Sequence, residues 1–132
     1  MSKRKKIKDR DIFKIAFEVI DLLIKEGLWF DICIYCLNYA FYTDGYFYPR
    51  RPYHYFSRKS GEYTADIYVL DNINVHKYLK YHGDILSIAF EGNLRDRFIY
   101  SSLSLAMHDI LAPYGLYYEI GEHWNLSVYP KD

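Results

Sequence analysis

Several features are scarce in this sequence. Its 132 residues include no glutamine, only two cysteines and only four prolines, and its uninterrupted apolar runs are short. A helix that crosses a bilayer needs about 20 predominantly apolar residues, so we expect no membrane span and no membrane partner. Two cysteines are too few for the disulfide framework of a small secreted protein, which favours a reducing cytoplasm.

The N-terminus also lacks the pattern of a secretory signal. A basic stretch, Lys3–Lys6, is followed by an amphipathic segment that carries Asp9 and Asp11, where a signal peptide would carry an apolar core. We therefore expect a cytoplasmic protein with a single domain over residues 1–132 and a short basic tail over about residues 1–8.

The composition is rich in tyrosine and balanced in charge. A hydrophobic share of 51% is enough for the core of one domain, and 16 tyrosines offer rigid contact area with a polar tip. The net charge is zero, yet residues 1–59 hold 12 basic and 7 acidic side chains, whereas residues 60–132 hold 5 basic and 10 acidic. Such a chain can be steered toward a charged partner at either end, or its folded surface can mix the two signs.

Apolar residues at helical spacing predict two helices. The first covers Asp9–Gly27, where apolar residues recur three and four positions apart and a glycine suits the C-terminal end. The second begins at Asn93 and closes near Tyr114; its apolar face is expected to contain Ile99, Leu103, Ala106 and Ile110, with Met107 and Leu111 beside them. A short helix can also form over Val75–Tyr81.

Aromatic and β-branched residues predict strands in three stretches. Leu28–Thr43 fits a pleated surface and ends at a turn formed by Asp44 and Gly45, and further strands are expected over Glu62–Leu70 and Asp84–Phe90. We expect two to four strands between the two helices.

The remaining segments place an edge and a hairpin in this sheet. Tyr46–Lys59 contains Pro49 and Pro52, which cannot donate to a ladder, so the segment is an edge strand or an exposed loop. Alternating apolar residues over Leu116–Tyr129 predict a C-terminal hairpin. The element order predicts an α+β fold, with two helices packed on one face of a mainly antiparallel sheet.

Cys33 and Cys36 have the C-x-x-C spacing of zinc sites and thiol redox sites. In a strand, positions three apart point to opposite faces, and the strand–helix context of a redox motif is missing. We interpret both residues as buried structural cysteines. Zinc is an alternative cofactor if histidines complete the site, and the candidates are His54, His76 and His82.

No arrangement of residues predicts an active site. The histidines are scattered without an H-E-x-x-H pair, the serines lack a G-x-S-x-G elbow, and the glycines fall singly at the ends of elements instead of forming a phosphate loop. We therefore expect a protein that is not an enzyme.

The segment Tyr46–Lys59 is the predicted binding surface because it interleaves aromatic and basic residues. That pattern suits a Tyr/Arg hot spot on a protein partner, or base stacking with phosphate contact. The alternative is a hairpin whose aromatics pack on the core. The residues expected to bind a partner are Tyr46, Tyr48, Arg50, Arg51, Tyr53, Tyr55 and Arg58 in this segment, and Asp66, Asp71, Glu119 and Glu122 in the acidic half.

The C-terminal third, from Phe90-Glu91-Gly92 through Tyr114-Gly-Leu-Tyr-Tyr-Glu-Ile-Gly-Glu-His-Trp-Asn-Leu-Ser-Val128, resembles small proteins carried by phages and mobile elements of low-GC Gram-positive bacteria. Some compact proteins of that origin are anti-CRISPRs, which implies an inhibitor of a CRISPR effector nuclease of the Cas9 type. Two other functions stay open: a nucleic-acid-binding module that uses the basic tail and Tyr46–Lys59, and a small zinc-supported interaction domain.

Overall fold

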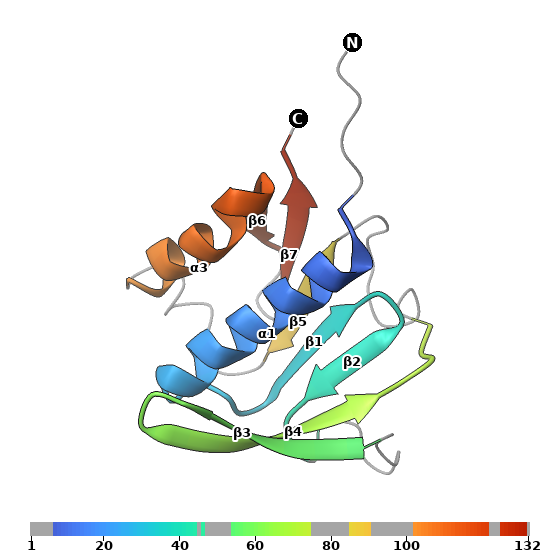
Figure 1. The fold of residues 1–132 in the computed structure, drawn as a ribbon, viewed down its shortest axis with the longest axis vertical. Helices are drawn as coiled ribbons and strands as arrows, with labels where there is room; N and C mark the ends of the chain where they lie inside the picture. The colour runs from blue at the N-terminus through green and yellow to red at the C-terminus, as the bar shows by residue number, and fades with distance from the viewer. Residues whose placement is uncertain are drawn as a thin grey trace.

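The computed structural model describes residues 7–44, 46, 54–74, 85–90, 102–121 and 125–131. In this part of the chain, helices and a seven-stranded antiparallel sheet form an α+β fold, as predicted (Figure 1). The helical elements are α1 (Asp9–Lys25), α3 (Leu103–Leu111) and the 3-10 turn η2 (Ala112–Tyr114). The strands are β1 (Ile32–Cys36), β2 (Tyr39–Tyr42), β3 (His54–Ser60), β4 (Tyr63–Leu70), β5 (Leu86–Phe90), β6 (Leu116–Ile120) and β7 (Asn125–Pro130).

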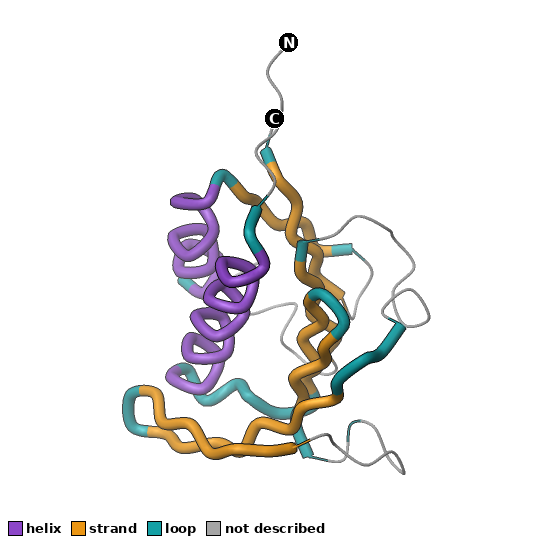
Figure 2. The backbone as a smooth tube through the Cα atoms, turned by 45° about the vertical axis from the view of Figure 1, so that its right-hand side comes forward, coloured by secondary structure: helices purple, strands orange, loops and turns teal. Residues whose placement is uncertain are grey.

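The strands lie in the order β3-β4-β2-β1-β5-β7-β6, and each neighbouring pair is antiparallel. Both helices cover the same face of this sheet, as predicted (Figure 2). The β3–β4 hairpin passes beneath the C-terminal end of α1, where Gly61 in the hairpin turn lies against the Lys25 side chain. None of the helices in the described residues is long and apolar enough to cross a membrane.

Helix α1 packs one complete face on the sheet. Its buried side chains recur at spacings of three and four and are Ile12, Ile15, Ala16, Val19, Ile20, Leu23 and Ile24. They share one core with strand residues such as Ile34 and Ile88. Because strand side chains alternate, the intervening residues, among them Cys33 and Tyr35, belong to a second cluster on the other face of the sheet. We call this other face the far side.

The stretch Leu28–Thr43 contains two strands, so five of the described strands precede α3 and the expectation of at most four was wrong. The chain reverses at Leu37 and Asn38, which connect β1 to β2 in an antiparallel pair. Leu37 adopts a φ of 53°. A leucine in the left-handed region is uncommon, so Leu37 does not indicate this turn.

The buried line of α3 is also displaced from the predicted one. Leu103, Met107 and Leu111 are buried, whereas Ala106 and Ile110 are only half-buried. The expected helix start at Asn93, the position of Ile99 and the short helix over 75–81 lie outside the described residues.

The orientation of α3 can be tested with two apolar residues of the same helix. Met107 is fully buried and Leu105 is 63% exposed. We expect Met107→Ala to lower the free energy of unfolding by about 2–5 kcal/mol, because it removes core packing, and Leu105→Ala to change it by about 0.5 kcal/mol or less. Urea denaturation of both variants measures the difference, and similar losses would contradict this packing.

Candidate functional site on the edge hairpin

Strand β3 lies at an edge of the described sheet. The segment Tyr46–Lys59 was predicted to be an edge strand or an exposed loop, and β3 agrees with the first of these. It pairs along its whole length with β4, from His54 opposite Val69 to Ser60 opposite Tyr63. Alternate side chains of a strand point to opposite faces. The helix side therefore receives His54, Phe56, Arg58 and Ser60, and the far side receives Tyr55, Ser57 and Lys59.

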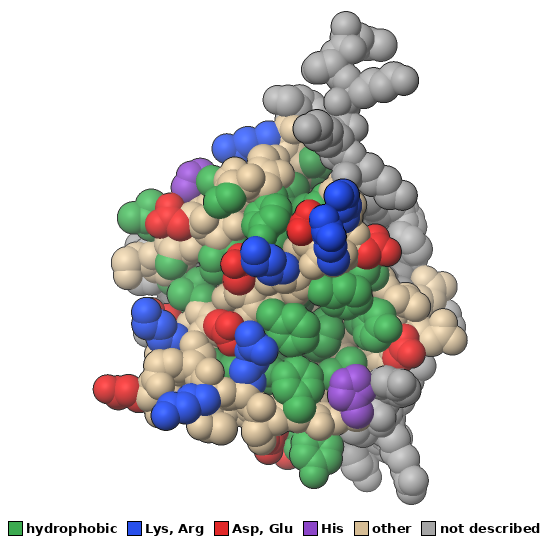
Figure 3. Space-filling model, viewed as in Figure 1, with side chains coloured by type: hydrophobic (Ala, Val, Ile, Leu, Met, Phe, Trp, Pro, Cys, Tyr) green, Lys and Arg blue, Asp and Glu red, His purple; other side chains and the backbone are tan. Residues whose placement is uncertain are grey.

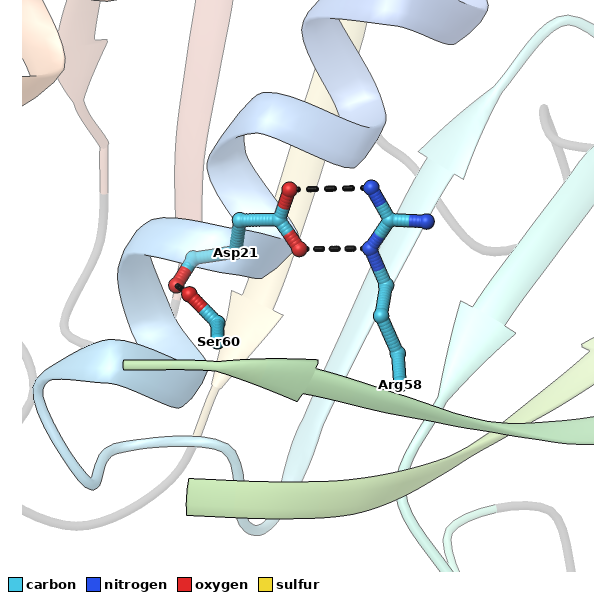
Figure 4. Close-up of polar contacts among 3 residues, drawn as sticks. All are labelled: Asp21, Arg58 and Ser60. Atoms are coloured by element: carbon cyan, nitrogen blue, oxygen red, sulfur yellow. Dashed lines mark hydrogen bonds and ion pairs between the residues drawn. The ribbon is translucent and has the colours of Figure 1, made fainter. Parts of the chain in front are cut away.

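On the helix side, Arg58 fastens β3 to α1 (Figure 4). Its Nε and Nη2 donate to the two carboxylate oxygens of Asp21, at 2.5 and 2.9 Å. Its guanidinium carbon lies 5.0 Å from the centre of the Phe17 ring. Ser60 Oγ donates to the main-chain oxygen of Asp21 at 2.7 Å. The hydrogen bond to Asp21 raises the pKa of Arg58. Arg58 is among the residues predicted to bind a partner, but in this structure its guanidinium is bound by Asp21 of the same chain.

Aromatic rings continue this contact from β3 to the core. The Phe56 ring centre lies 6.0 Å from that of Phe17, which lies 5.3 Å from that of Phe41, and His54 stacks on Phe56 at 6.2 Å. Figure 3 shows hydrophobic side chains gathered on this face beside α1 and over β2 and β3. Phe56 thus follows the alternative interpretation of the segment, in which its aromatics pack on the core.

The far side of the hairpin carries a row of tyrosines on three neighbouring strands. Tyr55 on β3 lies opposite Tyr68 on β4, which lies opposite Tyr42 on β2. The ring centres of Tyr55 and Tyr68 are 5.5 Å apart and those of Tyr68 and Tyr42 are 5.9 Å apart. Tyr42 is buried, Tyr68 is half-buried and Tyr55 is 64% exposed, so the row leads from the core to solvent.

Two exposed aspartates, Asp44 and Asp66, lie beside this row. Ser57 Oγ donates to Asp66 Oδ1 at 2.6 Å, and Trp29 Nε1 donates to the main-chain oxygen of Asp66 at 3.1 Å. Partial burial and the negative charges of Asp44 and Asp66 raise the pKa of Tyr68. We call Tyr55, Tyr68, Asp44 and Asp66 the tyrosine–aspartate surface.

The other residues predicted to bind a partner are divided between the two ends of the sheet. Tyr46 packs in the far-side cluster that also contains Tyr68, and Asp71 follows β4 and is half-buried. Glu119 lies on β6, the opposite edge strand, and lines a small pocket with Asn125. The predicted residues that lie outside the described part are Tyr48, Arg50, Arg51, Tyr53 and Glu122.

The two thiols lie on opposite faces of β1, as strand geometry predicts. Cys36 belongs to the helix-side core, whereas Cys33 belongs to the far-side cluster. Both are free and buried, and burial raises the pKa of Cys36 to about 12 and that of Cys33 further. Among the described residues, which include His54 but not His76 or His82, no group of three His, Cys, Asp or Glu side chains is placed to hold a metal ion.

Fold and site define a small α+β protein in which exposed aromatic and acidic residues gather on an edge hairpin. Comparison of the chain with protein-family models, with curated proteins and with solved structures gives no match.

The anchoring role of Arg58 can be tested against its neighbour Lys59, an exposed cation on the other face of β3. We expect Arg58→Met to lower the free energy of unfolding by about 1 kcal/mol, because it removes the ion pair and the cation–π contact but keeps an apolar stem. Lys59→Met should have less than half this effect. Urea denaturation in low and high salt measures both, and the Arg58 effect should shrink in high salt. Equal effects would contradict the anchor.

The raised pKa values predict slow thiol chemistry. A thiol is protonated below its pKa and the thiolate is the reactive form, so at neutral pH a maleimide should label neither Cys33 nor Cys36 in the folded protein and both after denaturation. Mass spectrometry counts the labels. Rapid labelling of the folded protein would contradict this burial, and stoichiometric zinc whose removal by a chelator unfolds the protein would favour the zinc alternative.

Proposed function

We propose that the chain is a non-enzymatic binding protein that contacts another protein through the far side of its β3–β4 hairpin. The observation that carries this proposal is Tyr55, a large side chain that is 64% exposed while its ring stacks on Tyr68. Tyrosines with few rotatable bonds are favoured at interfaces because ordering them costs little entropy. Stacking on a neighbour lowers that cost further.

Exposed hydrophobic side chains concentrate near this hairpin. The described residues contain four such side chains, and Tyr55 and Tyr63 both belong to the hairpin. A third, Phe30, follows Trp29, which donates a hydrogen bond to the main chain of β4. Tyr55 and Tyr63 lie on opposite faces of the hairpin, so each face presents one aromatic ring to solvent.

The finer form of the proposal is an inhibitor of a CRISPR effector nuclease of the Cas9 type. Such nucleases hold nucleic acid in positively charged channels, and the exposed acidic residues Asp44 and Asp66 complement that charge. The C-terminal resemblance to proteins of phages and mobile elements supports the same partner by analogy.

A nucleic-acid-binding function receives less support from this surface. Asp44 and Asp66 beside Tyr68 would repel phosphates, and the net charge of the chain is zero. Affinity for single-stranded DNA that falls steeply with salt would favour this second function.

The proposal predicts a complex that depends on Tyr55. Purified protein mixed with Cas9-type nucleases should co-elute in size-exclusion chromatography, and Tyr55→Ala should weaken the complex by about 30-fold, since a hot-spot tyrosine contributes about 2 kcal/mol. Tyr63→Ala is the matched control, because Tyr63 is 52% exposed on the same hairpin but points to the helix side. No complex at micromolar concentration would overturn the nuclease form, and equal weakening by both variants would overturn the assigned face.

A further inference from the structure

Arg58 shows how this protein holds an arginine. The guanidinium meets both oxygens of the Asp21 carboxylate and lies over the face of the Phe17 ring. A carboxylate and an aromatic face are the two groups that match a planar guanidinium, because one accepts its paired N–H groups and the other attracts its delocalised charge. The helix side of β3 therefore contains a complete arginine site with its arginine in place.

The far side of the same strand carries the receiving groups and one lysine, Lys59, but no arginine. Asp66 offers an exposed carboxylate that Ser57 orients at 2.6 Å, and Tyr55 offers an exposed ring supported by Tyr68. Within the described part of the chain, neither Asp44 nor Asp66 forms an ion pair with a cation. The negative charges of both aspartates act on the neighbouring Tyr68, because they contribute to its raised pKa.

We propose that the tyrosine–aspartate surface binds an arginine side chain of the protein partner, with the guanidinium on the Tyr55 ring and its N–H groups directed to Asp66. This inference rests on the proposed protein-binding function and specifies the chemistry of the partner. The partner segment is basic, because Asp44 adds a second exposed negative charge beside the row of rings.

Arginine fits this surface better than lysine does. A guanidinium can stack on a ring and bind a carboxylate at the same time, whereas an ammonium is a compact, strongly hydrated point charge. The surface should therefore distinguish the two residues, although they carry equal charge. This preference separates a built site from general attraction between opposite charges.

The test uses the full chain and three fluorescent peptides of equal length, in which glycine alternates with arginine, with lysine or with glutamate. Fluorescence anisotropy at low salt should show the arginine peptide binding several-fold more tightly than the lysine peptide, and no binding of the glutamate peptide. Asp66→Asn and Tyr55→Leu should each weaken the arginine peptide by about tenfold, while Tyr55→Phe, which keeps the ring, should stay within about twofold of the parent.

Asp109→Asn is the matched control, because it removes one exposed negative charge from α3, on the helix side of the sheet. Equal weakening by Asp109→Asn and Asp66→Asn, or equal affinity for the arginine and lysine peptides, would overturn the inference. Circular dichroism melts of each variant exclude loss of fold. Tyr55→Phe serves as a second check, because it removes only the hydroxyl group and keeps the ring.

The two proposals fail in different ways. If the arginine peptide binds as expected but no nuclease forms a complex, the arginine site stands and the nuclease partner is wrong. If a nuclease complex forms and Tyr55→Ala weakens it but Asp66→Asn leaves its dissociation constant unchanged, the binding face stands and the arginine site is overturned.

Discussion

In the described part of the chain, a sheet of seven strands offers more surface than α1 and α3 can cover, and an ion pair fixes the edge strand β3. Helix α1 packs over the central strands, and Arg58 of β3 reaches back from the edge to Asp21 on α1. Because the two oxygens of one carboxylate accept from two nitrogens of one guanidinium, the contact fixes both position and orientation of the strand. The hairpin is thereby held against α1.

This anchor gives the two faces of β3 different roles. Phe56 and Arg58 face α1 and add to packing, so we expect substitutions of these residues to lower the free energy of unfolding. Tyr55 and Ser57 face away, where Tyr55 rests on Tyr68 and Ser57 orients Asp66. Alternate side chains of this strand thus have two roles: those on the helix side hold the hairpin in place, and those on the far side form its exposed surface.

Much of the fold could be predicted because its apolar periodicity is regular. Helix α1 and the C-terminal hairpin β6–β7 have the expected bounds to within about two residues, since apolar residues recur every three and four positions in the helix and every second position in the hairpin. The turn at Leu37 was not predicted because leucine is not a residue type that favours a left-handed turn position. The buried face of α3 was predicted wrongly because neighbouring apolar faces of this helix have the same residue spacing. Contact with α1 and the sheet decides which of these faces is buried.

The candidate site could be predicted only in part. Composition pointed to the segment that contains β3, and charge pointed to Asp66. Periodicity says that Tyr55 and Arg58 lie on opposite faces, but it cannot say which face is inside. That choice depends on Asp21, which is 37 residues from Arg58 in the chain. Tyr68 and Asp44 come to the site through the β2–β4 pairing, which no local pattern encodes.

The alternation of β3 also restricts how the hairpin can vary in length. With Arg58 held by Asp21, one residue inserted between Tyr55 and Arg58 would turn the Tyr55 ring to the helix side and bring its neighbour to the far side. Two inserted residues would restore the original parity. Between its anchor and its exposed tyrosine, this strand therefore behaves like a reading frame of two, in which even changes of length preserve the presented face and odd changes exchange it for the packed one.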